Sequence, residues 1–470
     1  MGDKATFVFD KIAGTTSQPK DYQKRVLKKL EKEQALLLYH GTGSGKTLTS
    51  LLAAADQDLE ASIIGPASLK HNFPKERAKH NVKAKFTYHS YHKPPADPTS
   101  TKDKLLVFDE AHNMGRMESA RSHYPDVYQG KKELYLTATP IRNNPDELIP
   151  IIRGLGVNLP RNRQAFNDAF IEEVKKEPGF WNKHVRHIKP SVTKRAKNLD
   201  VLAKALKGKV DYYKPGTKDY PSVSEETIRV EMSKNQYKAY KETMKGNPSL
   251  MYKIKRGMAP DKQESKDLNS FLSASRQISN TARGFDLKSK AEDEPKINRM
   301  AKEIAKYNKL DKNYRGVSYS NYLKSGVIPL SKRLTKKGIS HALFTGKLNS
   351  QQKADIVKDY NSGKIKQLLV SGAGAEGLDL NGTKMLQVME PHWNEPKIHQ
   401  VKGRAVRFKS HAHLPINERN VKIQHYIATP RKEGIFFKKR PKGTDEYLDM
   451  MSDRKTKLNE QFLQKLRTLS

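Results

Sequence analysis

The chain has 470 residues, 36% of them hydrophobic, so it is long enough for two or three domains that have a very polar surface. The absence of cysteine excludes disulfides, cysteine-ligated zinc and thiol catalysis, and no apolar run approaches the roughly 18 residues that span a bilayer. Lysine and arginine number 89 against 51 acidic residues, and this net charge of +38 predicts a polyanionic partner, of which nucleic acid is the usual one.

The first residues, MGDKATFVFDKIAG, carry charges within their apolar stretch, which is atypical of a secretory signal, so we expect an intracellular protein without a membrane partner. Two segments then alternate short apolar runs with helical patterns, which is typical of parallel α/β sheets. In the first segment, four strands are predicted at 35–39, 62–65, 104–108 and 133–137. In the second, five are predicted at 316–320, 341–345, 366–371, 385–390 and 422–428.

The region between the two segments is polar and is predicted to be mostly helical. Its part from Lys245 to Lys290 is poor in apolar residues and is either an extended helical insert or partly disordered. The stretch 445–469 has apolar residues near helical spacing and is predicted to be a helix that packs back on a lobe. The predicted organisation is therefore an N-terminal lobe at 1–155, a helical linker at 156–300, a C-terminal lobe at 301–430 and a basic C-terminal helix at 431–470.

A glycine-rich loop, HGTGSGKT, follows the strand predicted at 35–39 and precedes a helical pattern. This is the context of a phosphate-binding loop, in which backbone N–H groups and a helix N-terminus face phosphate oxygens. Lys46 is expected to reach the β- and γ-phosphates and the Thr47 hydroxyl to ligate Mg²⁺. His40 stands where the strictest pattern has glycine, and we interpret it as a tolerated variant. The loop residues are Gly41, Thr42, Gly43, Ser44, Gly45, Lys46 and Thr47.

Two carboxylates end the next long apolar strand, in LLVFDEAH at 105–112. Parallel α/β sheets place ligands at the carboxyl ends of their strands. We expect Asp109 to hold Mg²⁺ and Glu110 to orient and polarise the attacking water. The pair follows Lys46 with another strand between, which strengthens the joint interpretation.

Arg404 and Arg407 are three residues apart in HQVKGRAVRFKSH, so on a helix they would share a face. Planar guanidinium groups suit the charge of a transferring phosphoryl group. A solvated basic helix is the alternative in so basic a chain. The glycine-rich turn SGAGAEGLDLNG at 371–382, which follows a strand, favours the functional interpretation.

This ordered set resembles the motifs of superfamily-two helicases and translocases, specifically the Swi–Snf-like branch, over nearly the whole chain. The segments that carry the resemblance are DYQKRVL (21–27), GPASLKHNFPKE (65–76), DEAH (109–112), YLTATPIRNNPDEL (135–148), VEMSKNQYKAY (230–240), FLSASRQISN (271–280), ALFTGKLNSQQK (342–353), SGAGAEGLDL (371–380) and WNEPKIHQVKGRAVR (393–407). The ending RFKSHAHLP (407–415) lacks the Gly-Gln of nuclear remodelling enzymes and is more similar to helicase-like ATPases of large DNA viruses and phages.

The resemblance implies an α/β fold of two tandem RecA-like parallel-sheet lobes with helical insertions and a C-terminal helix. It implies ATP and Mg²⁺ as cofactors, with Gln23 reading adenine and with Gly377 and Asp379 among the nucleotide-binding residues. Catalytic roles fall to Lys46, Asp109, Glu110, Arg404 and Arg407, and metal binding to Thr47 and Asp109. Coupling between the nucleotide and the nucleic acid is assigned to His112, Thr137, Thr139 and Gln400.

The implied function is an ATP-dependent nucleic-acid motor that hydrolyses ATP between its lobes and translocates on double-stranded DNA. A strand-separating DNA or RNA helicase is one alternative. An ATP-switched nucleic-acid-binding subunit of a viral transcription or replication assembly, with partner proteins there, is another. DNA is the expected polymer, with RNA as the alternative. For a viral protein the expected location is the cytoplasm or the virion, with the nucleus as an alternative.

Overall fold

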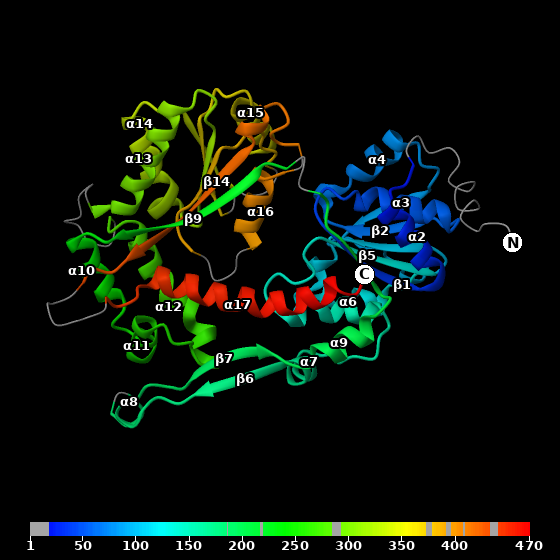
Figure 1. The fold of residues 1–470 in the computed structure, drawn as a ribbon, viewed down its shortest axis with the longest axis horizontal. Coiled ribbons are helices and arrows are strands. Elements are labelled where there is room, and N and C mark those ends of the chain that lie inside the picture. The colour runs from blue at the N-terminus through cyan, green and yellow to red at the C-terminus, as the bar shows by residue number, and fades with distance from the viewer. Residues whose placement is uncertain are drawn as a thin grey trace. The chain divides into compact units, whose positions relative to one another are not determined.

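The computed structural model describes residues 18–185, 187–216, 220–283, 293–372, 378–391, 396–407, 409–432 and 440–470 (Figure 1). The chain forms two compact units. The first unit comprises 1–172, 194–216 and 455–470, and the second comprises 173–193 and 217–454. No helix among the described residues is long and apolar enough to cross a membrane.

The first unit is built on a six-stranded parallel sheet in the order β3-β2-β4-β5-β1-β8. Its strands are β1 (Ala35–His40), β2 (Ala61–Gly65), β3 (Phe86–Ser90), β4 (Leu105–Asp109), β5 (Lys132–Thr137) and β8 (Val210–Tyr213). All four strands predicted in this lobe are found. β1, β2 and β4 are fully buried along their length, because a parallel sheet is covered by helices on both faces.

Helices cover both faces of this sheet. One face packs Leu36 and Leu38 of β1 against apolar side chains of α2, α3 and α4. The other face packs Leu37 against α6, α7, α9 and the last turns of α17. The helices of this unit are α2 (Asp21–Lys32), α3 (Lys46–Asp56), α4 (Asn72–His80), α5 (Tyr124–Val127), α6 (Ile149–Gly154), α7 (Arg163–Phe170) and α9 (Leu199–Leu206).

The second unit contains another six-stranded parallel sheet, in the order β11-β12-β10-β13-β14-β9. Its strands are β9 (Ser222–Glu231), β10 (Gly316–Ser320), β11 (His341–Phe344), β12 (Gln367–Ser371), β13 (Met385–Val388) and β14 (Asn420–Thr429). The five strands predicted in this lobe are all present. Helices α13 (Pro295–Leu310) and α14 (Ile328–Lys336) pack on one face, and α15 (Ser350–Asn361) and α16 (Pro396–Ala405) on the other.

A cluster of helices is inserted in the second unit, as expected for the stretch from Lys245. Its helices are α10 (Lys234–Thr243), α11 (Pro248–Arg256) and α12 (Lys262–Asn280). Asp261 begins α12 with a capping box, because its Oδ1 accepts from the backbone N–H of Glu264 at 2.7 Å and Glu264 Oε2 accepts from that of Asp261 at 2.9 Å. The same Glu264 forms a buried ion pair with Lys253 of α11, with Nζ and Oε2 2.6 Å apart.

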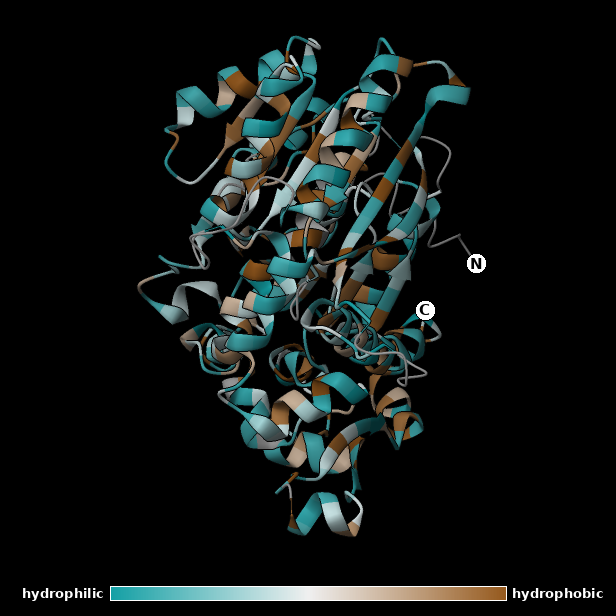
Figure 2. Cartoon of the chain, turned by 90° about the vertical axis from the view of Figure 1, so that its left-hand side faces the viewer, coloured by the Kyte–Doolittle hydropathy of each residue, from teal (hydrophilic) through white to brown (hydrophobic). Residues whose placement is uncertain are grey.

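The region predicted to be a mostly helical linker holds more helix than strand, but it also contains strands that the sequence patterns did not predict. Four strands lie there: β8, β9 and the ribbon of β6 (Ile171–Lys176) and β7 (Ser191–Ala196). β9 is the edge strand of its sheet and most of its side chains are exposed, so its sequence SVSEETIRVE has no apolar run. Figure 2 shows the hydrophobic colour recurring along strands, while hydrophilic residues cover much of the helices.

The predicted C-terminal helix is present as α17 (Thr444–Arg467). Its first turns bury Tyr447 and Leu448 among the inserted helices of the second unit. Its last turns bury Phe462 and Leu466 in the core of the first unit, beside Phe166 of α7. A single helix therefore contributes to both hydrophobic cores.

The edge strand β8 is fixed to β1 by a buried carboxylate. Asp211 is fully buried, and its carboxylate hydrogen-bonds to His40 Nε2 at 2.8 Å, to Arg25 Nε at 2.7 Å and to Lys29 Nζ at 3.0 Å. Burial raises the pKa of Asp211, but the hydrogen bonds from these three partners outweigh it and hold the pKa well below its ordinary value. His40 is therefore a structural residue that joins the first and last strands of this unit.

We predict that Asp211→Asn lowers the free energy of unfolding of the first unit by about 2–3 kcal/mol at pH 7, because His40, Arg25 and Lys29 lose the buried negative charge that they share. Ionised Asp211 contributes its full stability above the unfolded carboxyl pKa of about 3.9, and this contribution fades as the pH falls further. The free energies of unfolding of the two proteins should therefore converge in acid. Urea unfolding followed by circular dichroism measures the difference. The control Asp200→Asn, whose side chain is 93% exposed, should change little.

Candidate active site

The loop between β1 and α3 has the geometry of a phosphate cradle. Gly43 and Gly45 both have φ of 78°, in the left-handed region that side chains with a Cβ avoid. The helix begins at Lys46, directly after Gly45. The loop thus leads the N-terminal N–H groups of α3 toward the space where a phosphate would lie.

Lys46 is held by the loop itself. Its Nζ donates to the carbonyl oxygens of His40 at 3.0 Å and Gly41 at 3.3 Å. Burial lowers the pKa of Lys46, while the charges of Glu110 and Asp109 oppose this shift. A buried ammonium that still lacks a full counterion favours an anionic ligand beside it.

The acidic pair lies at the carboxyl end of β4. Asp109 is 5% exposed, and its Oδ1 accepts from the backbone N–H of Glu110 at 3.1 Å. Burial and the neighbouring charge of Glu110 raise the pKa of Asp109 to about 7. Glu110 has a φ of 51°, which is strained for a residue with a side chain. A cation would relieve the burial of Asp109, so the donor set fits Mg²⁺.

A series of close polar contacts leads from this pair to the end of β5. His112 Nδ1 lies 3.4 Å from Glu110 Oε2 and hydrogen-bonds to Thr137 Oγ1 at 2.8 Å. Thr137 Oγ1 in turn accepts from the backbone N–H of Thr139 at 3.0 Å. Burial lowers the pKa of His112 well below its ordinary value, with the charges of Arg142 and Lys46 adding to the shift, so the ring is neutral. The structure brings the three predicted coupling residues His112, Thr137 and Thr139 together.

Strand register explains why these side chains converge. β5 pairs with β4 so that Asp109 lies beside Leu136, and with β1 so that Tyr39 lies beside Thr137. All three strands are parallel, so the loops after them leave from one edge of the sheet.

The predicted adenine reader, Gln23, lies beside the loop in a fully bonded environment. Its Nε2 donates to Thr49 Oγ1 at 3.1 Å, and its Oε1 accepts from the backbone N–H of Lys20 at 3.0 Å. The neighbouring Tyr22 donates its hydroxyl hydrogen to the carbonyl of Ser44 and stacks on Tyr213, with ring centroids 3.6 Å apart. Helix α2 therefore braces the phosphate loop, and adenine recognition by Gln23 stays a prediction.

Sequence reasoning gave no role to Arg142 in the loop after β5. Partial burial lowers its pKa, and the charges of Glu110 and Glu147 oppose the shift, so this cation lies close to Glu110. Glu147 Oε2 accepts from the backbone N–H groups of Arg142 at 2.6 Å and Asn143 at 2.9 Å. Asn459 of α17 donates to the Asn143 carbonyl at 3.1 Å. The position of a charged residue inside the segment 135–148 could have indicated a role for Arg142. Nothing in the sequence indicated the contact between Asn143 and α17.

In the second unit, Arg407 forms an ion pair with Asp379, so two predicted site residues meet. The expected shared helical face of Arg404 and Arg407 is wrong, because α16 ends at Ala405 and Arg407 lies in the turn that follows. That turn is closed by the backbone N–H of Arg407, which donates to Ser410 Oγ at 3.2 Å. Gly377 and the side chains of Gln400 and Arg404 lie outside the described residues.

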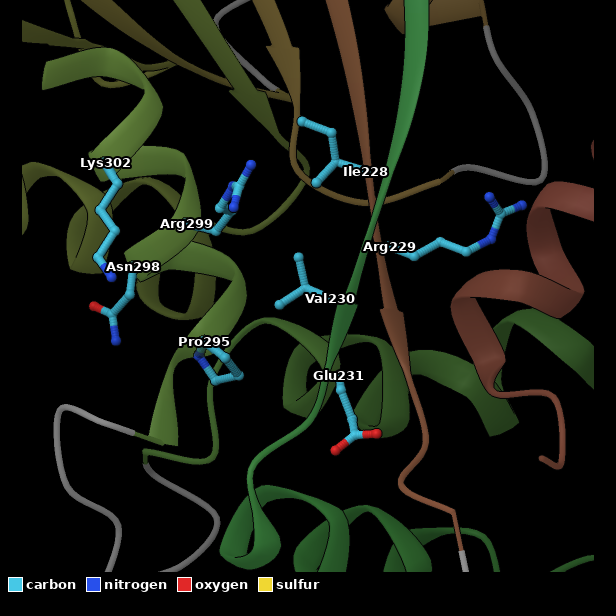
Figure 3. A pocket seen from close by; sticks show the side chains of 8 residues that line it. All are labelled: Ile228, Arg229, Val230, Glu231, Pro295, Asn298, Arg299 and Lys302. Atoms are coloured by element: carbon cyan, nitrogen blue, oxygen red, sulfur yellow. The ribbon is translucent and has the colours of Figure 1, made fainter. Parts of the chain in front are cut away.

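A pocket of about 550 Å³ in the second unit lies between β9 and α13 (Figure 3). Ile228 and Val230 point from β9 toward α13, whereas Arg229 points to the other side of the strand. Arg299 and Lys302 line it from α13. No residue predicted for the nucleotide site lines this pocket, and we assign it no part in hydrolysis.

The chain is similar to known helicase-like proteins. Residues 56–283 match the model of the SNF2-related domain, and residues 296–409 match that of the helicase conserved C-terminal domain. Protein L538 of Acanthamoeba polyphaga mimivirus, named as a candidate ATP-dependent RNA helicase, is 34% identical over 93% of this chain and 94% of its own length. The chain belongs to the SNF2-related family of helicase-like proteins.

Two further proteins are more distantly similar to this chain. A termination factor NPH-I homologue of African swine fever virus is 26% identical over 88% of this chain and 72% of its own. The solved SWI2/SNF2 ATPase core of Sulfolobus solfataricus in complex with dsDNA has 16% identity over 97% of this chain and 98% of its own, with a TM-score of 0.38.

Family membership confirms the predicted enzyme class and the predicted fold of two RecA-like parallel sheets. The SNF2-related protein is an ATP-hydrolysing, helicase-type motor that acts on nucleic acid. The family also implies that it uses ATP.

We predict that Glu110→Gln retains ATP binding and loses at least 99% of turnover, because the amide keeps the shape of the side chain but cannot polarise water. Fluorescent-nucleotide binding and phosphate release measure the two properties. Lys46→Ala is the contrasting variant and should lose binding as well. Normal turnover in Glu110→Gln would remove Glu110 from the role of water-orienting residue.

Proposed function

We propose that this SNF2-related ATPase is a translocase on double-stranded DNA. The observation that carries the proposal is the match of residues 56–283 to the SNF2-related domain, a span that holds the acidic pair and the whole coupling loop. The motif YLTATPIRNNPDEL supports it, because it resembles the coupling motif of Swi–Snf-like translocases in particular.

The residues of the first unit would act in hydrolysis as follows. Lys46 and the N–H groups of the loop bind the β- and γ-phosphates. Thr47 and Asp109 hold Mg²⁺, which would neutralise charge on the phosphates when bound. Glu110 orients the attacking water, and His112, whose Nδ1 lies 3.4 Å from Glu110 Oε2, transmits the state of this site to Thr137 and the loop after β5.

The arginines of the second unit would stabilise charge on the γ-phosphoryl group. Arg407 already binds a carboxylate, that of Asp379, so phosphate oxygens would replace one anion by another. We propose the same role for Arg404, together with nucleotide contacts for Gly377 and Asp379 and a coupling role for Gln400. These roles rest on the sequence motifs alone.

The protein would contact its nucleic acid mainly through the phosphate backbone. A surplus of 38 positive charges favours phosphate contacts, which carry no sequence information. Binding by the motor should therefore depend weakly on sequence and fall steeply with salt.

Two alternatives are each favoured by one relative. The name of the mimivirus relative favours an RNA helicase, which would separate strands. The name of the African swine fever virus relative favours an ATP-dependent factor inside a viral transcription assembly. Duplex stimulation without strand separation distinguishes the proposed translocase from the first, and activity without partner proteins distinguishes it from the second.

We predict that duplex DNA raises ATP turnover more than single-stranded DNA or RNA does at the same salt concentration, because the track is a duplex. The protein should also displace a third strand from a triplex in an ATP-dependent way, while a fully paired duplex stays paired. Steady-state phosphate release and gel analysis of labelled strands give both readouts. Stimulation by RNA alone, or unwinding of the duplex, would contradict the proposal.

A further inference from the structure

The β6–β7 ribbon carries an exposed aromatic tip. The short helix α8 (Phe180–His184) lies at the end of the ribbon, in the part that belongs to the second unit (Figure 1). Phe180 is 72% exposed and Trp181 is 73% exposed, and Val185 beside them is 59% exposed. Among the large hydrophobic residues that are exposed in the described part of the chain, Phe180 and Trp181 are the two aromatic ones.

The tip is held in place by contacts with the inserted helices. Ile188, which follows α8, is only 3% exposed. The carbonyl of Pro190 accepts from Lys253 Nζ of α11 at 2.8 Å, and the backbone N–H of Lys189 donates to Ser249 Oγ at 3.4 Å. The same Lys253 is the buried partner of Glu264. One side of the tip is thus anchored, and the aromatic side is left to solvent.

The rings are arranged so that their faces stay accessible. Phe180 and Trp181 meet edge to face, with centroids 6.3 Å apart and planes at 89°. Phe180 also contacts His184, with centroids 4.7 Å apart. An edge-to-face pair cannot cover both ring faces, which explains why each side chain remains largely exposed.

The surroundings of the rings are basic. Residues 171–197 contain eight lysines and arginines against three glutamates, a net charge of +5 with histidine neutral. Lys175 and Lys176 are exposed on the ribbon, and the exposed Lys183 of α8 has its Nζ 3.3 Å from Glu177 Oε2. Exposed aromatic rings beside exposed lysines are the combination that binds unpaired nucleotides, since the rings stack on bases and the ammonium groups contact phosphates.

We propose that Phe180 and Trp181 form a stacking site for unpaired nucleotides of single-stranded nucleic acid. Bases inside a duplex present only their edges, so flat rings find base faces only where strands are unpaired. A protein partner is less well matched, because two rings and one valine amid lysines form too small an apolar patch for a stable protein interface. The site goes beyond the proposed duplex track: it gives the motor a second contact, on a strand that is not paired.

The test is binding of a 20-nucleotide oligothymidylate to the full chain, without ATP, by fluorescence anisotropy. The double variant Phe180→Ala/Trp181→Ala should bind about tenfold or more weakly, as expected for the loss of aromatic stacking. Leu310→Ala removes a hydrophobic side chain that is 71% exposed on α13 and is the matched control, with unchanged affinity expected. Trp181→Phe keeps a ring and should retain most of the affinity.

A second readout uses the fact that the chain has only two tryptophans. The oligothymidylate should quench the tryptophan emission of the unmodified protein, and Trp181→Phe should lose this quenching. Equal affinity of the double variant, or quenching that survives in Trp181→Phe, would overturn the stacking site. So would an unchanged affinity accompanied by a shift in oligomeric state, which would identify α8 as a contact between copies.

The outcome is separable from that of the proposed function. The double variant should keep the duplex-stimulated ATP turnover of the unmodified protein, because α8 contributes nothing to the hydrolysis site. Failure of duplex DNA to stimulate the unmodified protein would count against the translocase and leave the stacking site standing on the binding data.

Discussion

Parallel pairing of β5 with both β4 and β1 is the constraint on which the rest of the active site depends. It aligns the carboxyl ends of three strands that are 22 or more residues apart in the sequence, so the phosphate loop, the acidic pair and the coupling loop leave from one edge. Each of these strands is almost entirely buried, so a shift in register would disrupt the packing of its side chains on both faces of the sheet. The same burial that stabilises the sheet therefore positions the chemistry.

Burial also sets the charge state of the site. Asp109 and His112 are buried and Lys46 is partly buried, and in each case burial is the main cause of the pKa shift. Charges in such an environment are poorly solvated, so they respond strongly to a phosphate or a cation placed among them. The hydrogen bond between His112 and Thr137 gives that response a direct route to the loop after β5.

Sequence patterns predicted the strands whose burial makes them uniformly apolar and the loop residues whose chemistry is distinctive. They missed β8 and β9, since an edge strand such as SVSEETIRVE alternates exposed charges and lacks an apolar run. The partners of Asp211 could not be predicted, because His40 lies 171 residues away in sequence and nothing local marks the pair. The prediction that Arg404 and Arg407 share a helical face was wrong for a related reason. α16 ends before Arg407, which forms an ion pair with the distant Asp379.

We propose that the acidic pair communicates with the loop after β5 through His112 and Thr137. A double-mutant cycle on nucleic-acid-stimulated turnover tests it most directly, with His112→Ala, Thr137→Val and the two combined. If the hydrogen bond carries the coupling, each single variant lowers stimulated turnover by about tenfold or more and the combination is no worse than either one. Multiplying effects, or full stimulation in both single variants, would contradict the account.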